Sequence, residues 1–156
     1  MFESLRNLVT ELTDGGKHPS HFDEDDYRLA AAALLVHAAA IDGAMPQVAR
    51  EKLHALIKQR FALDDAKTDE LLAEATEAER QSIDLYQFTA RLNRSLDEKG
   101  RARVVEMLWQ IVYADGVVTE FEDNLVWRAA DLLHISQNER IALRKRVAGE
   151  ETNGNA

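Results

Sequence analysis

Apolar residues recur every three or four positions along most of the chain, which is the spacing of one face of an α-helix. The stripes are formed by Phe2, Leu5, Leu8, Val9 and Leu12; by Val48, Leu53, Leu56, Ile57 and Phe61; by Ala66, Leu71, Leu72 and Ala75; by Leu85, Phe88, Thr89 and Leu92; by Val104, Val105, Leu108, Ile111 and Val112; by Phe121, Leu125, Val126, Ala129, Leu132 and Leu133; and by Ile141, Leu143 and Val147. Strand-like alternation of β-branched residues is missing. The pattern predicts an all-α fold, a compact bundle of seven to eight short helices.

One further stretch, Leu29 to Ile41, is apolar on nearly every face. A helix of this kind lies at the centre of a bundle, and its alanines allow neighbouring helices to approach closely. Asp23 is predicted to cap its start, with Asp26 in the first turn, and Gly43 is predicted to end it. The run is shorter than the ~20 residues that a membrane-spanning helix needs, so no membrane insertion is expected.

Several polar residues stand where a helix start needs a side-chain acceptor. Asp64 is the predicted cap of the fourth helix, and Pro46 stands where the first residue of the third helix is expected. Ile83 and Phe88 have the spacing of a hydrophobic staple, and Gly149 is predicted to end the last helix. Capping-box spacing joins Asp84 to Gln87, Ser95 to Glu98, Thr119 to Glu122 and Ser136 to Glu139.

The same order of elements occurs twice in the chain: an apolar helix, then an Asp-Gly pair, then a second helix. Asp42-Gly43 and Asp115-Gly116 are 73 positions apart. In that register Leu35 falls on Leu108, Met45 on Val118 and Leu53 on Val126. The repeat predicts two similar helix–turn–helix halves packed about a pseudo-twofold axis.

The length of 156 residues and the apolar share of 46% suit a single domain with one core. We expect this domain to span residues 1–150, followed by a flexible tail over residues 151–156. The chain has no cysteine, so disulfides and thiolate metal sites are excluded. Its N-terminus lacks the pattern of a secretory signal, and a cytoplasmic location is expected.

The formal net charge of −9 predicts an acidic surface, which repels nucleic acid and anionic lipid and attracts cations or basic proteins. From Asp64 to Glu79 there are seven acids and one lysine, interpreted as a solvated face or as an acidic docking surface. The basic residues gather near the C-terminus, at Arg140, Arg144, Lys145 and Arg146. They are interpreted as the solvated last turns of a helix rather than a nucleic-acid site, because no aromatic residues interleave with them.

The Asp-Gly turns place carboxylates at helix–helix junctions and form the candidate site. If the halves pack symmetrically, Asp42 and Asp115 can approach each other, with Glu122 one turn into the following helix. Such oxygen ligands suit hard cations such as Ca²⁺ or Mg²⁺. An alternative needs no ion: an aspartate before a glycine bonds its own turn, and Glu122 serves its capping box. The residues alone favour this alternative, and the spacing is not that of an EF-hand.

Motifs for catalysis are missing, including a nucleophile elbow, a phosphate loop and a His-Glu-x-x-His pair. The five histidines form no metal motif. His37 is interpreted as a core histidine, and His54 and His134 have no partner pattern. A metal-dependent hydrolase using the carboxylates lacks an evident base, nucleophile or oxyanion donor, so we expect no enzymatic activity.

The segments Tyr113-Ala-Asp-Gly-Val-Val-Thr-Glu-Phe-Glu122, Ala40-Ile-Asp-Gly-Ala-Met45 and Asp84-Leu-Tyr-Gln-Phe88 together resemble the tellurite-resistance protein B (TerB-like) family. The resemblance covers about residues 25–148. It implies an all-helical, acidic, cytoplasmic domain with two similar halves, associated with stress, tellurite-oxyanion resistance and divalent-cation binding. A related domain precedes the J-domain of a membrane-anchored co-chaperone.

Carried over onto this sequence, the acidic site of the family falls on Asp42, Asp115 and Glu122. One position departs from the pattern, because Ala49 stands where the first half should carry the counterpart of Glu122. The resemblance implies a non-enzymatic domain that binds a divalent cation, a protein partner or both in a stress response. The alternative is a purely structural protein-interaction module without a metal site. The identity of the partner and the oligomeric state stay open.

Overall fold

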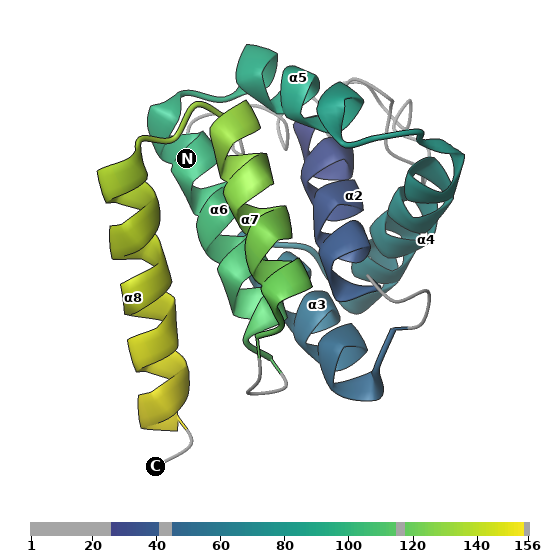
Figure 1. The fold of residues 1–156 in the computed structure, drawn as a ribbon. Helices are drawn as coiled ribbons and strands as arrows, with labels where there is room; N and C mark the ends of the chain where they lie inside the picture. The colour runs from purple at the N-terminus through teal and green to yellow at the C-terminus, as the bar shows by residue number, and fades with distance from the viewer. Residues whose placement is uncertain (1–25, 41–44, 115–117, 155–156) are drawn as a thin grey trace.

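The computed structural model describes residues 26–40, 45–114 and 118–154, with side chains up to residue 149. Every regular element in these ranges is an α-helix, which confirms the predicted all-α bundle (Figure 1). The described helices are α2 (Tyr27–Ala39), α3 (Gln47–Arg60), α4 (Asp65–Gln81), α5 (Tyr86–Ser95), α6 (Glu98–Val112), α7 (Glu120–Leu132) and α8 (Gln137–Gly154). The helix predicted over residues 2–12, the Asp23 cap and Gly43 lie outside the described residues.

Helix α2 is the centre of the bundle, as its apolar sequence predicts. Ten of its thirteen residues are buried, among them the four consecutive alanines at positions 30–33. It packs against α3, α4, α5, α6 and α7, and Figure 1 shows it surrounded by these helices. Small side chains on several faces permit this, because helix axes approach closely where no large side chain separates them. The second core element is α6, which buries Leu108 and Trp109 almost completely.

Two helical hairpins, α2–α3 and α6–α7, correspond to the two predicted halves. Helices α2 and α6 pack against each other, α3 contacts α6, and α7 contacts α2. In each hairpin, the second helix therefore contacts the first helix of the other hairpin. In Figure 1, α2 and α6 both run from the upper to the lower part of the view. Their C-terminal ends therefore lie at the same end of the bundle. Helices α4 and α5 lie between the hairpins in sequence, and α8 packs against α6.

Two of the predicted helix starts are confirmed. The Asp64 carboxylate accepts a hydrogen bond from the backbone N–H of Lys67 at 2.7 Å. Thr119 and Glu122 make both bonds of the capping box at the start of α7. At α8, the backbone N–H of Glu139 donates to Ser136 Oγ at 3.2 Å, which is one of the two bonds expected there.

Other predicted helix starts are displaced. Asp26 is the N-cap of α2 and not a first-turn residue, and its carboxylate accepts from the N–H of Arg28 at 2.8 Å. Asp97 caps α6 in place of Ser95, which is the last residue of α5. Pro46 is the N-cap of α3 and not its first helical residue. At α2 and α6 the physical reason is competition, since any short polar side chain near a helix start can accept from the first turn.

Several apolar residues predicted to be buried are exposed. Val48 is 52% exposed, Phe121 is 65% exposed, and Ala66 is exposed as well. Ile83 is 99% exposed, so the predicted staple with Phe88 does not form. All of these except Ile83 lie in the first turn of a helix, where a residue in the apolar stripe can project past the neighbouring helices. The last helix also differs from prediction, because α8 continues through Gly149 to Gly154.

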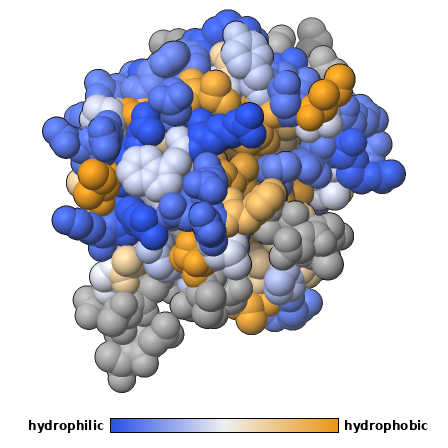
Figure 2. Space-filling view, in the orientation of Figure 1, coloured by the Kyte–Doolittle hydropathy of each residue, from blue (hydrophilic) through white to orange (hydrophobic). Residues whose placement is uncertain are grey.

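The surface drawn in Figure 2 is mostly hydrophilic, with separate hydrophobic patches between charged side chains. This agrees with a chain of which 30% is charged. Among the described helices, none combines the length and the apolar character that crossing a lipid bilayer requires.

Candidate functional site

The start of α7 is the part of the predicted site that the structure describes. Glu122 Oε1 accepts hydrogen bonds from the backbone N–H of Thr119 at 3.0 Å and from Thr119 Oγ1 at 3.0 Å. In return, Thr119 Oγ1 accepts from the backbone N–H of Glu122 at 3.1 Å. Glu120 and Asp123 share the same first turn, so three carboxylates stand at the positive end of the α7 dipole.

The corresponding start of α3 is built differently. Pro46 occupies the N-cap and has no side-chain acceptor, and Ala49, at the position that corresponds to Glu122, is buried. Glu51 lies two positions further on, where its carboxylate accepts from the Gln47 side chain at 3.1 Å. The two helix starts therefore differ, as Ala49 predicts. The first turn of α7 contains acidic residues, whereas α3 has a buried alanine at the position equivalent to Glu122.

Asp42 and Asp115, the other two predicted ligands, lie outside the described residues. Within the ranges that are described, His, Cys, Asp and Glu side chains nowhere gather in a group of three or more suited to a metal ion. Of the three predicted site residues, the structure thus places Glu122 alone. Its position is at the end of the bundle where α2 and α6 finish.

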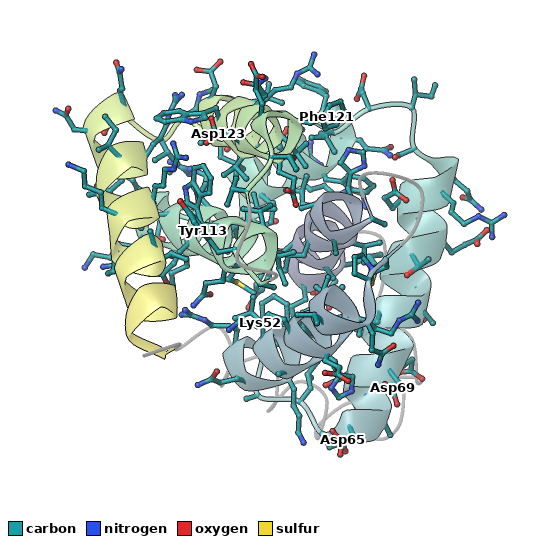
Figure 3. All side chains as sticks on the ribbon, turned by 60° about the horizontal axis from the view of Figure 1, so that its bottom comes forward. Lys52, Asp65, Asp69, Tyr113, Phe121 and Asp123 are labelled. Carbon is teal, nitrogen blue, oxygen red and sulfur yellow. The ribbon has the colours of Figure 1, made fainter. Side chains whose placement is uncertain are left out.

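Sequence analysis missed a pair of exposed apolar side chains at this end. Val48 and Phe121 are 73 positions apart, so they are equivalent residues of the two hairpins. Each lies in the first turn of the second helix of its hairpin, and each is more than half exposed. Figure 3 labels Phe121 on α7. Their equivalent places in the repeat could have indicated that they belong together, but their periodicity led to both being assigned to the core.

The acidic helix α4 is joined to its neighbours by histidines whose partners the sequence did not indicate. His37 Nδ1 of α2 lies 2.9 Å from Glu79 Oε1, and His54 Nε2 of α3 lies 3.1 Å from Asp69 Oδ1. His37 was interpreted as a core histidine; it has a partner in Glu79, but it is half-buried and lies at the edge of the core. The carboxylates of α4 thus serve partly as contacts between helices.

The same interface contains Asp65, whose Oδ1 lies 2.8 Å from Nζ of Lys58. A hydrogen bond from this ammonium group, together with its charge, holds the pKa of the Asp65 carboxyl below its ordinary value. Asp65 and Asp69 are labelled in Figure 3, at the opposite edge of the view from Phe121. The acidic face of α4 is therefore separate from the start of α7.

A buried carboxylate links three helices on another side of the bundle. Glu106 of α6 accepts from Arg60 Nη2, at the end of α3, at 2.9 Å, and from Arg146 of α8 through its other oxygen. Arg60 also reaches Gln110 at 3.5 Å. Glu106 is the one charged side chain that is buried within the described residues, and its two arginines come from positions 46 and 40 residues away.

The basic cluster of α8 is not the solvated helix end that the sequence suggested. The Arg140 guanidinium lies 5.4 Å from the centre of the Trp127 ring, and that of Arg144 lies 5.1 Å from the Trp109 ring. Because α8 continues to Gly154, these arginines stand in its first half. The aromatic residues that the sequence pattern lacked are supplied by α6 and α7.

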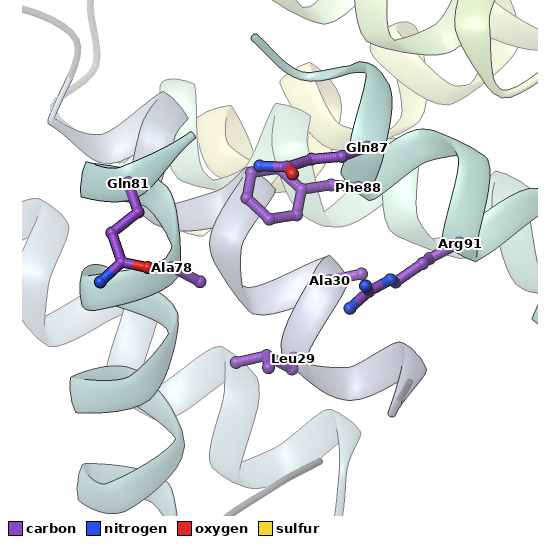
Figure 4. A pocket seen from close by; sticks show the side chains of 7 residues that line it. All are labelled: Leu29, Ala30, Ala78, Gln81, Gln87, Phe88 and Arg91. Carbon is purple, nitrogen blue, oxygen red and sulfur yellow. The ribbon is translucent and has the colours of Figure 1, made fainter. Parts of the chain in front are cut away.

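A cavity of about 260 Å³ opens between α2, α4 and α5 (Figure 4). Its apolar floor and its polar edge are formed by Leu29, Ala30, Ala78, Gln81, Gln87, Phe88 and Arg91. No candidate residue from the sequence lies in it, so it is independent of the Asp-Gly end.

Residues 28–145 match the family described as Tellurite resistance protein TerB. The chain belongs to the TerB family. No curated protein and no solved structure matched it in the corresponding comparisons.

The TerB match defines which parts of the bundle are the family domain. It begins in the first turn of α2 and ends within α8, so it contains both hairpins, the acidic helix α4 and the arginines at positions 140 and 144. Both Asp-Gly turns fall inside it. The resemblance based on a few short segments is thus confirmed over most of the chain.

Proposed function

We propose that this TerB domain is a non-enzymatic, cytoplasmic binding module that holds a divalent cation, Ca²⁺ or Mg²⁺, between its two Asp-Gly turns. The supporting observation is the arrangement of α2 and α6, which pack together and finish at the same end of the bundle (Figure 1). Asp42 and Asp115 each follow the last residue of their helix by three positions. Because the two aspartates are equally far along the chain from neighbouring helix ends, this arrangement favours a close approach of their carboxylates.

The residue types suit this role. Ca²⁺ takes about six to eight oxygen ligands and Mg²⁺ about six, so carboxylates of Asp42, Asp115 and Glu122 would be completed by backbone carbonyls and water. Glu122 uses Oε1 in its capping box, and its second carboxylate oxygen would face the ion. The net charge of −9 draws cations toward the molecule. The family description supplies the setting that we propose, which is a stress response of the tellurite-resistance type.

The test is a titration of the labelled full chain with Ca²⁺ and Mg²⁺, followed by amide NMR. Binding at the proposed site moves the signals of residues beside both turns, such as Met45 and Val118, with one common affinity. Glu122→Gln keeps the capping box, which accepts glutamine, and removes one charge, so it weakens binding. The matched control is Glu120→Gln, which removes the same charge from the same turn on another side of the helix. Equal weakening by both variants, or no shift at millimolar ion, contradicts the proposal.

A second candidate function is a protein-interaction module without a metal site. It is favoured by the exposure of Val48 and Phe121, at 52% and 65%, at equivalent positions beside the two turns. Large apolar side chains that remain exposed are a feature of surfaces that bind other proteins. The sequence repeat gives each hairpin such a residue, Val48 on α3 and Phe121 on α7.

Two kinds of substitution distinguish the candidate functions: removal of an aspartate charge and truncation of an exposed apolar side chain. In capture experiments from host extract, an interaction module retains its partner with Asp115→Asn and loses it with Phe121→Ser or Val48→Ser. A cation-dependent module loses its partner with Asp115→Asn and with a chelator. Tyr86→Ser is the control for apolar truncation, since Tyr86 is 64% exposed on α5, outside both hairpins.

A further inference from the structure

Helix α8 is attached to the bundle by few apolar contacts. Among its described side chains only Leu143 and Val147 are buried, as few buried apolar side chains as α4 and α5 have, but α8 packs mainly against α6, whereas α4 packs against both α2 and α3 and α5 against both α2 and α7. Ile141, the third apolar residue of its predicted stripe, is 36% exposed. Elements with few buried apolar contacts are those that open locally while the rest of a domain stays folded.

Ion pairs supply much of the remaining attachment. Arg140 Nη2 lies 3.1 Å from Asp131 Oδ1, and Arg144 Nη1 lies 3.0 Å from Asp123 Oδ1, both on α7. Arg146 pairs with Glu106 of α6. The sign is the same in every pair, with the cation on α8 and the carboxylate on the surface beneath it. That surface is therefore complementary in charge to a basic helix.

Aromatic rings form the rest of this surface. Trp109 and Trp127 stand edge to face with their centres 6.5 Å apart, and each lies under one arginine of α8. Arg144 Nε also donates to the Tyr113 hydroxyl at 3.3 Å, and this hydrogen bond holds the pKa of the Arg144 guanidinium above its ordinary value. The indole N–H of Trp109 is buried and has no acceptor within the described residues.

We propose that α8 separates from the bundle as a unit while α2 to α7 stay folded, and that the surface it leaves on α6 and α7 binds a basic amphipathic helix of a partner protein. The structure itself indicates what this surface accepts. Arg140 and Arg144 lie four residues apart, and Leu143 and Val147 supply the apolar contacts beside them. A partner helix with arginines and aliphatic residues at this spacing would meet the same carboxylates and rings.

Release of α8 is tested by hydrogen exchange of the full chain at low and at molar NaCl. Screening weakens the partly exposed ion pairs of Arg140 and Arg144, so amides of α8 exchange about tenfold faster in high salt while α2 and α6 keep their protection. Arg144→Ala gives the same selective loss at low salt. Lys145→Ala is the matched control, because it removes an equal charge from an exposed side chain one residue away. The emission of the two tryptophans follows the same change, since both lie beneath α8.

Binding in trans is tested with a labelled peptide of residues 137–149 added to the full-length Leu143→Asp variant, whose own α8 has lost one of its two anchors. The peptide binds this variant at low salt and is released by molar NaCl. A peptide with Arg140→Glu and Arg144→Glu does not bind. If Leu143→Asp unfolds the whole chain, Arg144→Ala serves in its place. Exchange of α8 in step with α2 and α6 under all conditions overturns the proposal, as does failure of the peptide to bind a variant with an unprotected α8.

Discussion

Replacing Glu106 with glutamine is the sharpest test of how the outer helices are held. The change preserves shape and removes the charge from a buried carboxylate that accepts hydrogen bonds from Arg60 of α3 and Arg146 of α8. A hydrogen bond to a charged group contributes about 1.5–3 kcal/mol to stability, and a neutral one about 0.5–1.5 kcal/mol. Losing this difference at two bonds costs about 2–3 kcal/mol. Arg60 and Arg146 remain 31% and 57% exposed at their side chains and regain water, so we expect about 2 kcal/mol.

The assay is urea unfolding followed by circular dichroism. With a denaturant dependence of about 2 kcal/mol per molar urea, the midpoint falls by about 1 M. Glu77→Gln is the control, because Glu77 makes an exposed pair with Arg80 and its loss changes stability by less than about 0.5 kcal/mol. A midpoint for Glu106→Gln equal to that of the control would show that the buried carboxylate does not hold α3 and α8 onto α6.

Three further changes have defined outcomes. Thr119→Ala removes the N-cap of α7 and lowers stability by about 1 kcal/mol in urea unfolding, whereas Thr119→Ser keeps the hydroxyl and has little effect. His134→Gly raises the melting temperature, because His134 has φ of 61° and glycine adopts this left-handed conformation without the penalty of about 1 kcal/mol. Lys58→Met raises the pKa of Asp65, measured by NMR titration of its carboxyl, because Lys58 holds that pKa below its ordinary value in the folded state. Because the carboxyl has a lower pKa in the folded state than in the unfolded state, its ionisation stabilises the fold above the unfolded pKa of about 3.9, and this stabilisation is lost as the pH falls. Lys58→Met removes this dependence of stability on acid pH.

The sequence predicted the helices and the core because both depend on local periodicity. Leu35, Leu108 and Val126 stand at the expected core positions and are buried. The start of α7 was predicted to the residue, since Thr119 and Glu122 satisfy each other within one turn. Where two short polar residues lay within a few positions, as with Ser95 and Asp97, local rules could not choose between them.

What the sequence could not give are contacts between distant segments. The pairing of His37 with Glu79 and of Glu106 with Arg60 joins residues 42 and 46 positions apart, and nothing in local spacing indicates it. The arginines of α8 were misinterpreted for the same reason, because their tryptophans lie on other helices. Phe121 was assigned to the core by its periodicity, yet whether a stripe residue is covered depends on how far the neighbouring helix extends.

The candidate site likewise has one part that local sequence predicts and one part that depends on contacts between distant segments. Glu122 was predicted with its alternative role, and the structure places it in that capping box at the end of the bundle where α2 and α6 finish. The meeting of Asp42 and Asp115 stays a prediction that the packing of α2 against α6 supports. A cation between the turns and a partner on Val48 and Phe121 would use the same end of the molecule, so the response of partner binding to Asp115→Asn decides between the two proposed functions.

The most direct test of a cation between the two turns is paramagnetic broadening by Mn²⁺ in the labelled full chain. Mn²⁺ shares the oxygen ligands of Mg²⁺ and broadens amide signals near its binding site. We predict that Met45 and Val118, which flank the two turns on different hairpins, broaden together at the lowest Mn²⁺ and recover together with excess Ca²⁺ or Mg²⁺. Broadening that begins on the acidic face of α4, around Asp65 and Asp69, or that reaches one turn without the other, would contradict it.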